Sequence, residues 1–303
     1  MTSSHIKTTD ANAERGTPRK GLWMFPGVPA GMLVDAVVAA EELGLDEVWI
    51  ADEGAARDPL SVLASAADRT TRIRLAVGIT SPLLRHPGAI AATVATLDEL
   101  SGGRAVLGLG IGGQLALEPF GLENSDRPIG VMKGAIETAR AVFAVEQTEN
   151  YDPPRHAFGP RSVPIWVGTQ GRQMSQLAAR SADGILLSGC TPKQQAEIVE
   201  RVRSLGEIEI ALHQSASANG PARSAIPASS RYQPNGSEEA ARDRAVGENY
   251  SVLSWDGAAE RLVEQAALHR PDAIGISLVD MNHDCDADAV SLVEQAAQVL
   301  TGL

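Results

Sequence analysis

Hydrophobic positions repeat one pattern from Gly21 to the end of the chain. Short apolar runs, rich in Val, Ile, Leu or Trp, alternate with longer stretches whose apolar positions recur at helical spacing. This alternation is typical of parallel strands joined by crossover helices. The predicted strands are Gly21–Phe25, Glu47–Ala51, Arg74–Ile79, Ala105–Leu109, Ile165–Gly168, Gly184–Leu187, Ile208–Leu212 and Ile274–Val279.

Each predicted strand is followed by an amphipathic stretch of helical length. The predicted helices are Leu33–Leu43, Leu60–Asp68, Pro87–Leu100, Ile129–Val145, Arg172–Ser181, Pro192–Leu205, Ala258–His269 and Ala287–Leu300. Eight such units predict an α/β fold, a (β/α)8 TIM barrel formed by residues 21–303, with residues 1–20 as a flexible N-terminal tail. The alternative is an open doubly wound sheet with a small appended domain.

Two stretches interrupt the repeat. Asn150–Val163 is rich in Pro and Gly and predicts a long loop before the fifth strand. His213–Gly236 has almost no apolar periodicity and predicts a mobile loop inserted after the seventh strand. In a barrel this insertion leaves the C-terminal face, where active sites lie. A lid over the site and a surface insertion without catalytic role both fit.

Charge and cysteine content narrow the partners. The chain has 26 Lys and Arg against 38 Asp and Glu, a net charge of −12, which repels nucleic acid and anionic membranes. No uncharged apolar run approaches the roughly 18 residues of a membrane span. Cys190 and Cys285 lie far apart without a CxxC companion, so no disulfide framework or metal site is expected and a reducing cytoplasm is favoured. The expected partner is a small molecule.

Several familiar motifs are missing or incomplete. HExxH, GxSxG and P-loop motifs do not occur, which argues against metalloproteases, α/β-hydrolases and P-loop NTPases. The acidic run Asp284–Asp288 imitates the start of a calcium loop but lacks its Gly and Glu, so we expect it to cap the last helix. The glycines of Gly108–Gly113 resemble a dinucleotide fingerprint, but the prolines that follow argue against a Rossmann site.

Glycines mark two strand ends as candidate ligand sites. Gly110, Gly112 and Gly113 end the fourth strand, where missing Cβ atoms would let a flat ligand approach. The run Gly168-Thr169-Gln170-Gly171-Arg172 leads directly into a helix. Free backbone N–H groups at that helix start, with Arg172 beside them, suit a phosphate. An ordinary turn with a solvated arginine is the alternative.

Polar side chains end two further strands. Asp52 and Glu53 follow the second strand and Thr80 follows the third. Carboxylates at the mouth of a barrel are typical of proton transfer or polar anchoring, although helix capping also fits. His86 precedes Pro87, at the start of a predicted helix, and predicts a cap or a packing role. The other histidines, His213 among them, stand in polar or helical contexts without a recognisable partner.

Three segments resemble the bacterial luciferase-like superfamily, in particular the branch of coenzyme F420-dependent oxidoreductases similar to methylenetetrahydromethanopterin reductase. They are AEELGLDEVWIADE (Ala40–Glu53), TRIRLAVGITSPLLRHPGAIAATVATLDELSGGRAVLGLGIGG (Thr71–Gly113) and VPIWVGTQGRQMSQLAARSADGILLSG (Val163–Gly189). The middle segment is the most specific. The resemblance therefore covers the predicted strands two to six.

The resemblance implies a barrel that holds coenzyme F420, or FMN as the alternative, at the C-terminal ends of its strands. It implies hydride transfer to or from a small organic substrate and a homodimer packed through helices near the second and third strands. Carried over by position, a non-prolyl cis peptide joins Gly78 to Ile79 behind the ring, with Thr80 beside it. Asp52 would bond the ring edge or polyol. The phosphate would be held by Gly168, Thr169, Gly171, Arg172, Gln173 and Met174.

The sequence departs from the family in places that bear on acid catalysis. Glu53 stands where the family often has His, while Gly113 and Ala116 replace a Glu and an Asn of some deazaflavin dehydrogenases. Asp52 and Glu53 remain the candidate catalytic residues, with Glu53 as the nearest proton donor. The alternatives are an FMN-dependent monooxygenase and a non-catalytic or degenerate paralogue.

Overall fold

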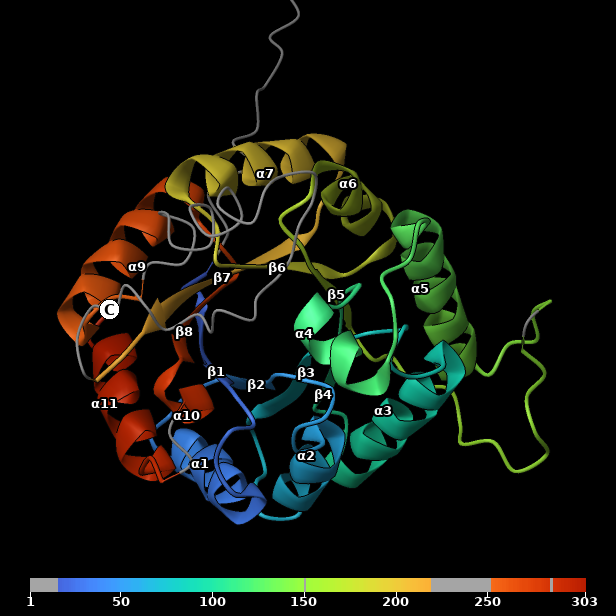
Figure 1. The fold of residues 1–303 in the computed structure, drawn as a ribbon, viewed down its shortest axis with the longest axis horizontal. Coiled ribbons are helices and arrows are strands. Elements are labelled where there is room, and N and C mark those ends of the chain that lie inside the picture. Colours follow the sequence, from blue (N-terminus) through green and yellow to red (C-terminus); the bar gives the residue numbers. More distant parts are fainter. Residues whose placement is uncertain (1–15, 150, 219–251, 284–285) are drawn as a thin grey trace, which may run out of the picture.

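Eight parallel strands close into a barrel in chain order, with the helices on its outside (Figure 1). This computed structural model describes residues 16–149, 151–218, 252–283 and 286–303. The strands are β1 (Arg19–Met24), β2 (Glu47–Ile50), β3 (Arg74–Thr80), β4 (Ala105–Leu109), β5 (Ile165–Gly168), β6 (Gly184–Ser188), β7 (Glu209–Ala216) and β8 (Ala273–Leu278). Strand β1 pairs with β8 over their whole length, from Arg19 with Ala273 to Met24 with Leu278. This pairing excludes the open sheet.

The eight long helices follow the strands as the sequence pattern predicts. They are α1 (Ala30–Glu42), α2 (Pro59–Ala67), α3 (Pro87–Ser101), α5 (Pro128–Ala144), α6 (Arg172–Ser181), α7 (Pro192–Leu205), α9 (Trp255–His269) and α11 (Ala289–Thr301). Short elements that the pattern did not predict are α4 (Gln114–Leu117), η1 (Glu118–Phe120) and α10 (Asp280–His283). In Figure 1, α4 and α10 lie at the near end of the barrel, which is the C-terminal end of its strands.

Side chains fill the barrel interior from alternate strand positions. Trp49 and Trp166 meet edge to face inside it, with ring centroids 5.5 Å apart. Gly184 allows this packing, because a Cβ there would lie 2.2 Å from the Trp166 ring. A second, larger core fills the space between barrel and helices. The interior is therefore packed, and a ligand can be held only at an end.

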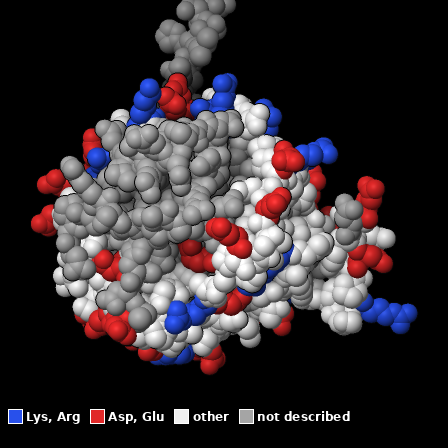
Figure 2. All heavy atoms as spheres, in the orientation of Figure 1, with Lys and Arg blue, Asp and Glu red and all other residues white. Residues whose placement is uncertain are grey.

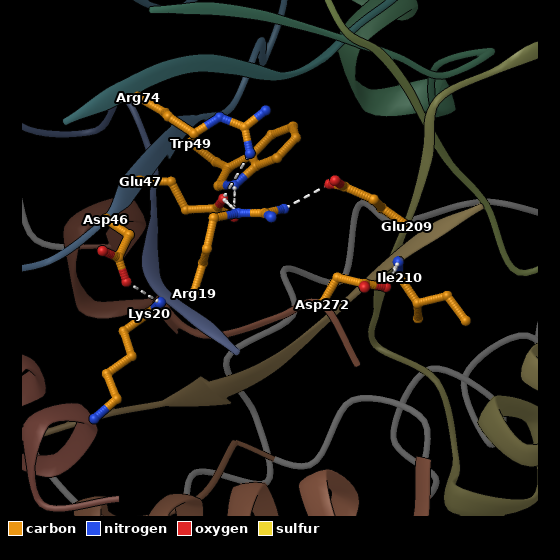
Figure 3. A network of polar contacts seen from close by, with 9 residues as sticks. All are labelled: Arg19, Lys20, Asp46, Glu47, Trp49, Arg74, Glu209, Ile210 and Asp272. Carbon is orange, nitrogen blue, oxygen red and sulfur yellow. Dashed lines mark hydrogen bonds and ion pairs between the residues drawn. The ribbon is translucent and has the colours of Figure 1, made fainter. Parts of the chain in front are cut away.

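Charged residues close the N-terminal end of the barrel (Figure 3). Glu47 is 1% exposed and accepts from Arg19 Nε at 2.9 Å and from Trp49 Nε1 at 2.8 Å. Arg74 Nη1 lies 3.6 Å from the same carboxylate, and Arg19 Nη2 donates to Glu209 at 2.7 Å. Each charge in this cluster has an opposite partner, which a buried ion needs.

Aspartates at the same end fix the pairing of neighbouring strands. Asp46, Asp183 and Asp272 each directly precede a strand and accept from a backbone N–H of the preceding strand, at 2.8, 2.7 and 2.9 Å. Arg104 plays the corresponding part before β4, donating to Ile73 O at 2.9 Å, to Ala67 O at the end of α2 and to Thr70 O in the loop that follows. These bonds set the register of the barrel from its N-terminal end.

The predicted boundary of the seventh strand is wrong. His213–Ala216, expected in a loop, continue β7, and His213 pairs with Gly275 while Ala216 pairs with Leu278. The polar sequence concealed this extension, because a strand near the mouth of a barrel can place polar side chains inside. Residues 219–236 of the predicted insertion lie outside the described residues. The loop before β5 is confirmed for residues 152–164, which form no helix or strand.

Candidate active site

Ile79 lies at the C-terminal mouth of the barrel and belongs to its interior cluster. The peptide bond between Gly78 and Ile79 is cis, as the resemblance implied. Gly78 packs against the indole of Trp49, where a Cβ would lie 2.6 Å from Cε3. The register between β3 and β4 shifts between Val77 and Thr80, around this bond. Ile79 remains partly exposed and presents an apolar surface at the mouth.

Glycines at the C-terminal ends of β4 and β5 make room for Ile79. A Cβ on Gly110 would lie 2.0 Å from Ile79 Cδ1, and one on Gly168 would lie 2.8 Å from the same atom. For Gly110 the predicted reason, direct approach of a flat ligand, is therefore wrong: the Ile79 side chain occupies that space. Gly112 has φ +87° beside Ser81 Oγ, whereas Gly113 is exposed and a Cβ there would meet nothing within 4 Å.

Asp52 is held in place between the ends of β2 and β3. One carboxylate oxygen accepts from Thr80 Oγ1 at 2.6 Å, and the other accepts from Gly54 N at 3.2 Å. Ser81 continues this connection toward β4 by donating to Ile111 O at 2.8 Å. The structure thus brings Asp52 and Thr80 together, as their positions at strand ends predicted.

Glu53 lies next to Asp52 but makes no hydrogen bond or ion pair with any residue that the structure describes. Its side chain is half-buried. Burial, and to a smaller extent the charge of Asp52, raises the pKa of the Glu53 carboxyl. Gly54 packs against the carbonyl of Ala116, so this loop contacts α4. A carboxyl that keeps its proton to higher pH is suited to proton donation.

The β5–α6 turn leaves backbone donors free at a helix start. Gly171 is the N-cap residue of α6, and no side chain caps the helix there. The first helical bond runs from Ser175 N to Gly171 O, so the N–H groups of Arg172, Gln173 and Met174 precede it. Arg172 and Gln173 are exposed, whereas the Met174 side chain packs into the core and leaves only its backbone for a ligand.

Two neighbours of this helix start have structural roles. Thr169 Oγ1 accepts from Gly171 N at 3.0 Å and shapes the turn. Gln170 Nε2 donates to Ser188 O at 3.0 Å and Gly189 O at 3.1 Å, so its amide nitrogen connects the β5 and β6 loops. The arrangement of N–H donors and a guanidinium is one that binds a phosphate.

His213 is a feature of the mouth that the sequence prediction missed. It is 2% exposed, and neither ring nitrogen has a hydrogen-bond partner among the described residues. Its ring meets Trp23 and Trp49 edge to face, with centroids 6.0 and 6.4 Å away. Burial lowers the pKa of His213 to about 4, although the negative charge of Glu47 acts in the opposite direction. The alternation of small or polar residues at 211, 213 and 215 is the signal that could have placed it inside the barrel.

Two capping predictions are confirmed. His86 is the N-cap of α3, where its Nδ1 accepts from Gly88 N at 3.1 Å. Asp288 caps α11 by accepting from Ser291 N at 3.1 Å, while Asp284 and Cys285 lie outside the described residues.

Within the described ranges, no group of three His, Cys, Asp or Glu side chains is placed to hold a metal ion. No helix in that part of the chain is long and apolar enough to cross a membrane.

The model of the luciferase-like monooxygenase family matches residues 5–275. The chain belongs to this family. It is 32% identical over 188 residues to the 5,10-methylenetetrahydromethanopterin reductase of Methanolobus tindarius, covering 60% of this chain and 57% of that one. It is 35% identical over 180 residues to the F420-dependent glucose-6-phosphate dehydrogenase of Nakamurella multipartita, covering 53% of each. The chain thus spans little more than half the length of these relatives.

The luciferase-like fold extends over nearly the whole chain. The coenzyme F420-dependent tetrahydromethanopterin reductase of Methanopyrus kandleri superposes with a TM-score of 0.72 at 19% identity, covering 95% of this chain and 99% of that one. At this identity the likeness concerns the fold. Together with the family match it confirms the TIM barrel and the resemblance stated from the sequence.

Proposed function

We propose that this protein is an oxidoreductase that uses coenzyme F420 for hydride transfer to or from a small organic substrate. The observation that carries the proposal is the pairing, at one mouth, of the apolar Ile79 surface with the open helix start at Arg172. A deazaflavin cofactor needs both, because it joins a flat ring to a phosphate-bearing tail. Relatives named as F420-dependent enzymes support the choice of cofactor.

Different residues at the mouth would bind different parts of the cofactor. Gly78 and Ile79 would back the ring, with Thr80 and Asp52 bonding its edge or polyol. Gly112 and Gly113 would border the ring at the end of β4. The phosphate would be held at the β5–α6 turn by the exposed side chains of Arg172 and Gln173 and by the backbone of Gly168, Thr169, Gln170, Gly171 and Met174. When bound, F420 supplies the carbon that gives or accepts the hydride.

Glu53 would act as the proton donor or acceptor. Its carboxyl has no partner in the described residues and a raised pKa, so the acid form persists to higher pH than in an ordinary glutamate. Asp52, whose two oxygens both accept hydrogen bonds, would instead anchor the ligand. The two neighbouring carboxyls therefore have different roles.

Cofactor titration tests this proposal. We expect F420 to bind with at least tenfold higher affinity than FMN, followed by fluorescence quenching of each. The second candidate is an FMN-dependent monooxygenase, favoured by the name of the family whose model matches. Tighter binding of FMN than of F420 would establish that candidate and reject the first.

We also propose a homodimer that packs through α2 and α3. The exposed positions of α2 are Ser61 and Ser65, and those of α3 apart from Glu99 are uncharged, namely Ala89, Ala92, Thr93, Thr96 and Leu100. Leu100 is 59% exposed. Light scattering should give twice the chain mass for the wild type and a monomer for Leu100→Glu. The free thiol of Cys190 is compatible with the cytoplasmic location that we propose.

A further inference from the structure

Most of the buried unpaired polar atoms inside the barrel lie on three neighbouring strands, β7, β8 and β1. Both nitrogens of His213 on β7, Oγ of Ser277 on β8 and Nε1 of Trp23 on β1 are buried and have no hydrogen-bond partner among the described residues. His213 is 2% exposed and Ser277 1%. The three strands are neighbours, since β8 pairs with both β7 and β1, and Ser277 stands opposite Trp23 (Figure 1).

The opposite side of the mouth is different. There the polar side chains of Asp52, Thr80 and Ser81 are paired with one another or with the backbone, and the exceptions are the half-buried Glu53 and the single indole N–H of Trp166 on β5. Ile79 and the start of α6 also lie on that side, along β3 to β6. Buried polar groups in native proteins nearly always have partners. Three unpaired ones on adjacent strands therefore indicate a place where a ligand supplies the hydrogen bonds.

Above the base of the barrel, the inward-facing side chains of β7, β8 and β1 form a wall without charged groups. Alternation along β7, β8 and β1 turns Ala211, His213, Ser215, Ala273, Gly275, Ser277, Gly21 and Trp23 into the barrel. Within the described residues of these strands, the inward positions beyond Arg19 and Glu209 at the base carry no Lys or Arg to hold a phosphate or a carboxylate. A neutral imidazole, a hydroxyl and an indole N–H together can donate to an oxygen and accept from a hydroxyl.

Space for His213 is provided by a glycine. A Cβ on Gly275 would lie 2.6 Å from His213 Nε2, so the ring lies directly against the β8 backbone. Trp23 and Trp49 pack on other sides of the ring. The imidazole is thus held in one orientation by packing alone, which is what a preorganised hydrogen-bonding group requires.

We propose that His213, Ser277 and the indole N–H of Trp23 bind the oxygen of an uncharged substrate, an alcohol or a carbonyl compound, across the mouth from Ile79. The inference rests on the proposed function for its assignment to the substrate, because the cofactor is taken to lie on the Ile79 side. It excludes phosphorylated and carboxylated compounds as preferred substrates.

The test uses 15N-histidine NMR on the full chain, with and without F420, titrated with three probes that share one ring. These are cyclohexanone, cyclohexanol and cyclohexanecarboxylate. The His213 signals are those lost in His213→Phe, and His269, a buried histidine of α9 outside the barrel, serves as internal control. We expect both neutral probes to shift the His213 signals, the carboxylate to leave them unchanged, and His269 to be unaffected.

A second variant, Ser277→Ala, tests the same site with a smaller change than His213→Phe. It should weaken the apparent affinity of cyclohexanone about tenfold, the scale of one lost hydrogen bond. The affinity for F420 should stay within about twofold of wild type, since this wall is not assigned to the cofactor.

An unmoved His213 signal with both neutral probes would overturn the inference, as would an equal response to the carboxylate. A tenfold loss of F420 affinity in Ser277→Ala would assign the wall to the cofactor and also overturn it. If F420 fails to bind while neutral probes still shift His213, the proposed function fails and the oxygen site stands.

Discussion

Buried or half-buried glutamates at the two ends of the barrel interior differ in whether they have hydrogen-bonding partners. At the N-terminal end, Glu47 is buried with Arg19, Arg74 and Trp49 as partners. At the C-terminal end, Glu53 has no partner among the described residues. The first arrangement neutralises every charge, which stabilises the fold. The second leaves hydrogen-bonding capacity open, which is of use only to a ligand.

The surface does not explain this difference. Seen from the mouth, acidic and basic side chains are scattered around the rim of the molecule instead of forming one patch of a single sign (Figure 2). The contrast therefore lies inside the barrel. Substitutions at the mouth should therefore change activity or binding with little effect on stability, and substitutions at the base should do the reverse.

The largest effect is expected from Glu53→Gln, which keeps the shape and removes the acid. If Glu53 transfers a proton, turnover of the F420-bound enzyme should fall by roughly 10²–10⁴-fold. Cofactor affinity should stay within about twofold, because only a transition-state interaction is lost. Steady-state kinetics and F420 titration measure the two effects. Glu118→Gln, an exposed glutamate of η1, is the matched control. Equal turnover in Glu53→Gln and wild type would show that Glu53 has no catalytic role.

Glu47→Gln should show the opposite behaviour at the base. Removing this charge leaves Arg19 and Arg74 facing each other with a buried neutral amide, so the free energy of unfolding should fall by about 3–5 kcal/mol. Urea denaturation measures the loss, and F420 affinity of the folded protein should not change. Glu209→Gln removes the half-exposed partner of Arg19 and should cost about 1 kcal/mol or less. A similar loss in both variants would mean that burial of the charge is not what matters.

Arg172→Ala should weaken cofactor binding by about 1.5–3 kcal/mol, the scale of a charge-assisted bond to phosphate. Because Arg172 is exposed, the unfolding midpoint should not move. Arg180→Ala, in the last turn of the same helix, should leave the dissociation constant as in wild type. An unchanged dissociation constant for Arg172→Ala at moderate salt would remove this residue from the site.

Most of the barrel could be predicted because its strands are continuous apolar runs. β4, β5, α6 and α7 have the predicted bounds. The end of β7 could not be predicted, since the polar residues from His213 to Ser215 are stabilised by pairing with β8, a contact across some 60 residues of sequence. One-turn elements such as α4 have too few residues for a period to show.

The site could be predicted where position on a strand decides it. Asp52 and Thr80 meet because neighbouring parallel strands end at the same edge. The cis bond after Gly78 came from the resemblance and not from any local pattern. The role of Gly110 and Gly168 could not be found from sequence, because it depends on where the side chain of Ile79 packs. The charge cluster at the base joins residues as distant as Arg19 and Glu209, which no local pattern relates.

The smallest effect is expected from Glu41 at the base, whose carboxylate accepts from the backbone N–H groups of Thr71, Arg72 and Ile73. Although partial burial opposes it, these bonds lower the pKa of Glu41 to about 2. A lowered pKa means that the contribution to stability is full above the unfolded-state value near 4.5 and is lost as pH falls toward 2. Because Glu41 is only partly buried and solvent screens its charge, Glu41→Gln should cost only about 1 kcal/mol at pH 7. The gap between variant and wild type, measured by urea denaturation, should narrow as the pH falls below 4.5 and close near pH 2, with Glu42→Gln, its exposed neighbour, as control. A gap of the same size at pH 6 and at pH 2 would mean that the carboxylate charge does not hold this loop.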